Sequence, residues 1–169
     1  MINIADILIE DKRWNDFRLQ NLADKTFGII FENLILSSKW KISILACNDA
    51  KITELNAEFR DKPTATNVLS WPNYNLKSQQ VGEVPKKPSL SVYEDDSLGD
   101  IAISFDTCKR EAADNNVDFI DHIIHLLMHG CLHLLNYDHI NEADAIIMEE
   151  LETRLLKVMG ISDPYLENK

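Results

Sequence analysis

The sequence predicts a small α/β (α+β) protein in which a small mixed sheet is packed with helices. Apolar residues make up 45% and charged residues 27% of the 169 residues, values typical of a globular protein. Short β-rich segments alternate with segments of helical periodicity as far as residue 105, and only helical periodicity follows. The length fits a single domain over residues 1–169.

The expected strands show either an alternation of apolar and polar residues or a β-rich composition. The first strand alternates and is placed at an edge of the sheet. The third is closed by Pro72, and the last follows a turn. The strands cover residues 2–7, 41–47, 66–71 and 98–105.

The expected helices carry apolar residues on one face. Asn48 or Asp49 is a candidate N-terminal cap of a short helix that Pro63 ends, and Asp106 is a candidate cap of the next helix. Gly160 stands where a C-terminal cap of the last helix is wanted. The remaining helices cover residues 14–36, 117–135 and 141–159.

Residues 73–97 predict a long loop. They hold two of the five prolines and the acidic run Glu94-Asp95-Asp96. A loop of about 25 residues inside a compact domain is unusual and is often functional. A surface insertion without a role fits the same composition, so the sequence leaves both readings open.

Composition limits the possible locations and partners. No uninterrupted apolar run exceeds five residues, whereas a membrane span needs about 20. The first ten residues carry no lysine or arginine, unlike a secretory signal, so we expect a cytoplasmic protein. The net charge of −11 argues against nonspecific nucleic-acid binding but leaves room for a local basic groove. The three cysteines show no CxxC spacing and are expected to be reduced and buried.

All five histidines lie between residues 122 and 139, and their spacing predicts a metal site. His129 and His133 are four residues apart, so both lie on one face of a helix. His139 can supply a third ligand if Asn136, a residue that tolerates the left-handed conformation, ends the helix. Three histidines with one open position are typical of a catalytic zinc site, here on a C-terminal helix and the turn after it.

A rival set consists of His122, His125 and His129, which also share a helical face. His122 and His129 would lie roughly 10 Å apart along the helix axis, which is too far for one zinc ion. We therefore expect His122 and His125 to line the helix face or to support the ligands. An ordinary polar position fits His122 better still, and three unrelated histidines remain the plain alternative for the main set.

Gly130 argues against peptide hydrolysis. In zinc proteases with this ligand spacing, the residue after the first histidine is a glutamate that acts as general base. Gly130 stands at that position here and has no side chain to take a proton. We expect no protease activity.

The segment His129–His139, HGCLHLLNYDH, resembles the HGxLHLxGYDH signature of the YbeY family, the bacterial rRNA-maturation endoribonucleases. Three further stretches follow in the family's order. They are similar to LNxxYR…TNVLSFP at 55–60 and 66–72, to LGDIxIS at 98–104, and to GIxDPY at 160–165. The likeness covers the chain from about residue 40. Asn136 replaces a glycine of the family pattern, and the 73–97 loop is longer than the family usually carries.

The resemblance implies a zincin-like, zinc-dependent, single-strand endoribonuclease acting in 16S rRNA 3′-end maturation and ribosome quality control. It implies one Zn²⁺ per chain on His129, His133 and His139, and a functional arginine at Arg60. It also implies ribosomal RNA and the small ribosomal subunit as partners, with neither membrane nor DNA expected.

Arg60 makes physical sense in such an enzyme. A metal lowers the pKa of its water toward neutral, so attack on phosphorus needs no separate protein base. The transition state then carries additional negative charge, and a guanidinium matches phosphate oxygens best. From the residues alone, a surface ion pair with Glu58 or Asp61 explains Arg60 equally well.

Two other functions stay open at this point. One is a metal-dependent hydrolase of another small substrate, and the other is a non-enzymatic ribosome-assembly factor with a structural metal. A closed fourth coordination position would favour the structural metal, and cleavage of ribosomal RNA would separate the two enzymes. The basic residues are scattered, so RNA binding requires them to converge on one groove or requires a partner that supplies docking.

Overall fold

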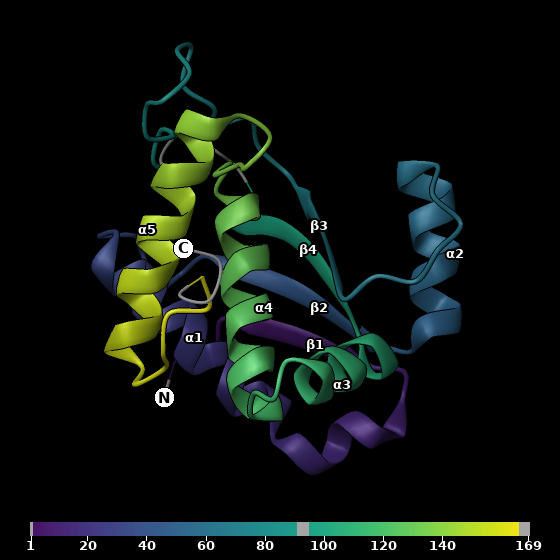
Figure 1. Ribbon diagram of the computed structural model, residues 1–169. Coiled ribbons are helices and arrows are strands. Elements are labelled where there is room, and N and C mark those ends of the chain that lie inside the picture. Colours follow the sequence, from purple (N-terminus) through teal and green to yellow (C-terminus); the bar gives the residue numbers. More distant parts are fainter. Residues whose placement is uncertain (1, 91–94, 166–169) are drawn as a thin grey trace.

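The computed structural model describes residues 2–90 and 95–165 and contains a four-stranded mixed sheet with the order β1-β2-β4-β3 (Figure 1). β2 pairs in parallel with β1 on one side and with β4 on the other, and β3 pairs antiparallel with β4 at the far edge. The strands are β1 (Ala5–Ile9), β2 (Lys41–Cys47), β3 (Val68–Pro72) and β4 (Ser97–Ser104). This confirms the predicted small mixed sheet.

The helices pack with this sheet, as predicted (Figure 1). A 3-10 helix, η1 (Lys12–Phe17), precedes them in the chain. The five α-helices of the described residues are α1 (Leu19–Asn33), α2 (Asp49–Arg60), α3 (Phe105–Asp114), α4 (Phe119–Leu134) and α5 (Glu142–Val158). α4, which carries four of the five histidines, crosses one face of the sheet (Figure 1).

Gly130 brings α4 close to the sheet. A Cβ atom at this position would lie 3.1 Å from Cδ1 of Ile101 on β4 and 3.5 Å from Cγ2 of Val68 on β3. The position that holds a general base in the proteases therefore faces packed side chains here. This close approach holds the part of α4 that carries His129 and His133 against β3 and β4.

Two N-terminal elements differ from the sequence prediction. β1 lies at the edge, as expected, but covers Ala5–Ile9 rather than residues 2–7. The backbone N–H groups of Ile4 and Ala5 both donate to Asp24 of α1 at 2.9 Å, so the strand starts where that carboxylate anchors it. The prediction of a single helix over residues 14–36 is wrong, because Arg18 adopts the left-handed conformation (φ 47°) and separates η1 from α1.

Of the caps predicted for the next two helices, the structure confirms the first and contradicts the second. Asn48 caps α2 by accepting a hydrogen bond from the backbone N–H of Lys51 at 3.0 Å, as one of the two expected alternatives. Asp106 does not cap α3, since the residue before the helix is Ser104. Asp106 instead lies in the first turn of α3 and accepts a hydrogen bond from the backbone N–H of Asp49.

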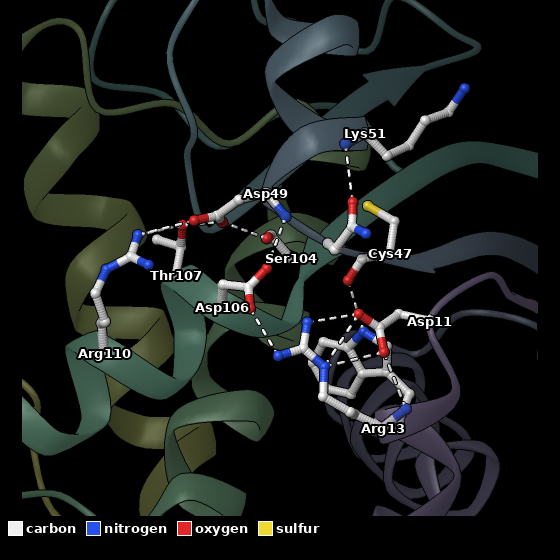
Figure 2. A network of polar contacts seen from close by, with 11 residues as sticks. Asp11, Arg13, Cys47, Asp49, Lys51, Ser104, Asp106, Thr107 and Arg110 are labelled. Carbon is white, nitrogen blue, oxygen red and sulfur yellow. Dashed lines mark hydrogen bonds and ion pairs between the residues drawn. The ribbon is translucent and has the colours of Figure 1, made fainter.

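These residues belong to a polar network at the carboxyl ends of β2 and β4 (Figure 2). Asp49 accepts hydrogen bonds from Ser104 at 2.7 Å, from Thr107 at 2.5 Å and from Arg110 at 3.0 Å. Arg13 bridges Asp106 and Asp11. The network ties η1, α2 and α3 together, so the amino end of α2 is fixed by polar contacts.

The loop between β3 and β4 lies where the sequence predicts it. Its described residues, 73–90 and 95–96, form neither helix nor strand, and residues 91–94, with Glu94 of the acidic run, lie outside the described part. Gly82 donates its backbone N–H to Asp144 of α5 at 2.8 Å, and Lys77 lies 3.8 Å from Asp138. The loop therefore packs beside the turn that follows α4.

The cysteines are buried and free, as expected. Burial raises the pKa of the Cys47 thiol to about 12, and it also raises the pKa values of Cys108 and Cys131. Within residues 2–90 and 95–165, no helix combines the length and the apolar character needed to cross a bilayer.

Candidate metal centre

The structure brings His129, His133 and His139 together. His129 and His133 lie one turn apart on α4, and their Nε2 atoms are 3.0 Å from each other. His139 returns from beyond the helix, and its ring centroid lies 5.3 Å from that of His129 and 5.0 Å from that of His133. One ligand nitrogen from each of the three residues lies within 4.8 Å of the others, which is the separation that one metal ion can bridge.

Asn136 makes the return of the chain possible. It has φ 71°, so the left-handed residue predicted from the sequence is present. Its N–H donates to the carbonyl of His133 at 2.9 Å, and that of Tyr137 donates to Leu132 at 3.0 Å, the paired bonds of a Schellman motif. The Asn136 amide also donates to the carbonyl of Tyr74 at 2.9 Å, which connects the helix end to the long loop.

His133 presents a lone pair to the centre. Its Nδ1 lies 3.0 Å from the carbonyl oxygen of Tyr137. Because a carbonyl can only accept, Nδ1 carries the proton and Nε2 does not. Burial, together with the neighbouring His129 and His139, lowers the pKa of His133 to about 4. A neutral imidazole is the form that binds a metal.

His129 is held by Glu152, which the sequence analysis missed. Nδ1 of His129 lies 2.5 Å from Oε1 of Glu152, a completely buried residue of α5. Burial opposes ionisation of Glu152, but hydrogen bonds from His125 and His129 outweigh it and lower its pKa to about 2. The sequence held one signal of this role, since Glu152 lies on the apolar face that carries Met148 and Leu155.

The rival histidines lie outside the triad, as expected. Nε2 of His125 lies 3.2 Å from Oε2 of Glu152, so His125 supports the carboxylate that holds His129. His125, His129 and Glu152 also form a second group of potential ligands within 4.8 Å of one another. Nε2 of His122 lies 3.0 Å from Glu111 of α3 and takes part in neither group.

Arg60 lines the same groove as the three histidines. The groove has a volume of about 770 Å³, and Lys62 and Asn67 also line it. Arg60 is the last residue of α2 and is exposed, and its Nη2 donates to the carbonyl oxygen of Ser70 on β3 at 2.7 Å. No ion pair joins Arg60 to Glu58 or Asp61 among the described residues, so that alternative is not supported.

The donor set fits a borderline metal such as zinc. Imidazole nitrogens are among its preferred ligands, and three of them leave a position for water or substrate. The hydrogen bonds of His129 to a carboxylate and of His133 to a carbonyl are the arrangement that orients ligating histidines in metal proteins.

Comparison with known proteins identifies the chain as one of the endoribonucleases. A family model described as Endoribonuclease YbeY matches residues 6–160. Relatives named Endoribonuclease YbeY are 48% identical over 164 residues in Ruegeria sp. (strain TM1040), covering 96% of both chains, and 45% identical over 165 residues in Paracoccus denitrificans, covering 98% of this chain and 91% of the relative. The chain therefore belongs to the YbeY endoribonuclease family, as its motifs predict.

A solved structure resembles the fold. The solution structure of a Thermotoga maritima protein matches with a TM-score of 0.60, over 91% of this chain and 87% of the other. Only 19% of the aligned residues are identical, so this likeness concerns the arrangement of helices and sheet alone.

Proposed function

We propose that this chain is a zinc-dependent endoribonuclease that cleaves single-stranded RNA in 16S rRNA 3′-end maturation and ribosome quality control. The observation that carries the proposal is the triad of His129, His133 and His139, which shares a groove with Arg60 in a member of an endoribonuclease family. RNA cleavage is what the family's name describes, and the site offers the chemistry for it.

His129, His133 and His139 hold one Zn²⁺ per chain in this proposal. Bound there, zinc supplies Lewis acidity and an activated water for attack on a phosphodiester. Glu152 and the Tyr137 carbonyl keep the protons of His129 and His133 on Nδ1, so that both Nε2 atoms stay available as ligands.

Arg60 binds the scissile phosphate in this proposal. Its hydrogen bond to Ser70 holds one part of the guanidinium on β3, and the group has further N–H donors for phosphate oxygens. A donor held in place before the reaction stabilises charge as it develops in the transition state. The residue thus acts on substrate while the histidines hold the metal.

The proposed partners are ribosomal RNA and the small ribosomal subunit, in the cytoplasm. The groove offers Arg60 and Lys62 as its cationic side chains, whereas the chain as a whole has a net charge of −11. Two cations bind a short stretch of backbone, so docking on a larger particle explains how an acidic domain of residues 1–169 reaches RNA.

A cleavage assay tests the proposal. Zinc-loaded chain is supplied with a labelled RNA that spans the 3′ end of 16S rRNA, with the same RNA annealed to its complement, with the equivalent DNA, and with casein. We expect cleavage of the single-stranded RNA alone, and none by His129→Ala. Intact RNA in the presence of one bound zinc would favour the structural metal, and digestion of casein would favour a peptidase.

A further inference from the structure

We infer that Glu152 is a positioning residue for the metal site, and that His125 and Tyr165 hold Glu152 in place. Through Tyr165, the segment after α5 becomes part of the metal centre. The inference rests on the proposed function only in taking His129 as a metal ligand. It assigns roles to three side chains outside the ligand triad.

The contacts of Glu152 divide between its two oxygens. Oε1 accepts a hydrogen bond from Nδ1 of His129 at 2.5 Å. Oε2 accepts hydrogen bonds from Nε2 of His125 at 3.2 Å and from the hydroxyl of Tyr165. The three donors fix the carboxylate from two directions, so the ring of His129 can rotate only by breaking its bond to Oε1.

A purely structural role does not explain this carboxylate well. Glu152 is completely buried, on a helix face that it shares with Met148 and Leu155. Removing a carboxylate from water is costly, and an apolar residue of similar size often serves stability as well or better. A carboxylate gains a use here because it fixes the tautomer of His129, so that Nε2 keeps its lone pair for the metal.

Tyr165 is held by contacts of its own. Its backbone N–H donates to Asp163 at 2.8 Å, and Asp163 also accepts a hydrogen bond from Thr153 of α5 at 3.3 Å. The Tyr165 ring packs edge-on against that of His125, with 6.0 Å between the centroids, and lines the groove. Figure 1 shows the chain after α5 turning back beside that helix toward α4.

Zinc affinity, measured by competition with a chelator, tests the inference. Glu152→Gln keeps the shape of the side chain but loses its charge, and we expect its Kd to rise about tenfold to hundredfold. Tyr165→Phe removes one hydrogen bond that supports Glu152, and we expect a rise of about threefold to tenfold. Glu150→Gln, an exposed change on the same helix, is the matched control and should leave Kd unchanged.

The tautomer of His129, measured by long-range ¹H–¹⁵N NMR on metal-free protein, separates positioning from general stability. We expect the Nδ1–H form in the wild type and a mixture in Glu152→Gln, with equal melting temperatures. Wild-type Kd values in both Glu152→Gln and Tyr165→Phe would overturn the inference, and Tyr165→Phe decides alone if Glu152→Gln does not fold. A second zinc lost on mutation of His125 or Glu152 would overturn it too, by making them ligands. Zinc binding without RNA cleavage by the wild type would refute the proposed function and leave this inference standing.

Discussion

Arg60 stands at the last position of α2, with its guanidinium fixed to the Ser70 carbonyl. We expect Arg60→Ala to lower the rate of RNA cleavage by about 10²–10³, because one preorganised donor to the developing charge is lost. Arg60→Lys should recover part of the rate, since lysine cannot bind phosphate bidentately. Single-turnover cleavage rates, measured beside zinc affinity, check this. Lys51→Ala on the same helix serves as control, and a wild-type rate for Arg60→Ala would remove Arg60 from the reaction.

Asn136 determines whether His139 reaches the other ligands. Valine is strained at φ 71°, so Asn136→Val should lower the free energy of unfolding by about 1–3 kcal/mol and weaken zinc binding. Asn136→Gly fits the same dihedral and should keep zinc affinity, although it loses the bond to Tyr74. Denaturant unfolding and zinc titration measure both effects. A valine variant that matches the wild type in both stability and zinc affinity would show that the turn does not depend on Asn136.

The sequence predicts those site residues whose relative positions depend only on residues close by in the chain. The spacing of His129 and His133, followed by a residue suited to the left-handed conformation, predicts the cluster with His139 that the structure shows. Glu152 could not be found in this way, because it lies 23 residues from His129 in the chain and only the packing of α5 on α4 joins them. Its burial among apolar positions was the one available sign.

Among the helices and strands, too, the features set by neighbouring residues are predictable from the sequence, and others are not. β2 covers Lys41–Cys47, as predicted, because polar and apolar residues alternate over its first four positions and the last three are apolar. The break before α1 was not predictable, since Arg18 at φ 47° is an uncommon residue for that conformation. Asp106 looked like a local cap, but the backbone of α2 competes for its carboxylate. A contact between segments far apart in the chain therefore decides the position of the second residue.

Gly99 sets how closely β3 lies against β4. It has φ 139°, and an added Cβ would lie 2.2 Å from the carbonyl oxygen of Trp71, a backbone atom that cannot turn aside. We expect Gly99→Ala to lower the free energy of unfolding by on the order of 3 kcal/mol, because both the dihedral and the contact are unfavourable. Urea denaturation measures the change. Gly28→Ala on α1, where an added Cβ meets nothing within 4 Å, is the control and should not destabilise; a loss below about 1 kcal/mol at Gly99 would show that β3 can shift.

At the scale of the whole molecule, charge limits how RNA is held. Arg60 and Lys62 are the arginine and lysine that line the groove, and the chain carries a net charge of −11. Two phosphate contacts on a single strand predict a slope of about −1.4 for the logarithm of the binding constant against that of salt concentration. The RNA must stay uncleaved while its binding is measured. An inactive variant such as His139→Ala, or a pH too low for turnover, would alter the metal site, so we would use the wild-type, zinc-loaded chain with a short single-stranded RNA whose phosphorothioate linkages resist cleavage.

Lys62→Ala should reduce that slope to about −0.7, because one contact is removed. Fluorescence anisotropy over a series of potassium chloride concentrations provides the slopes. A wild-type slope steeper than about −3 would mean that basic residues outside the groove also hold the RNA.

In the proposed function, the three histidines hold the one metal ion with which RNA is cleaved. A zinc titration of metal-free chain, with the rate of single-stranded RNA cleavage as the signal, tests it most directly. We expect the rate to rise from zero, to saturate at one equivalent of zinc per chain, and to stay at zero in His133→Ala. Cleavage by the metal-free chain, or the same titration curve for His133→Ala, would contradict it.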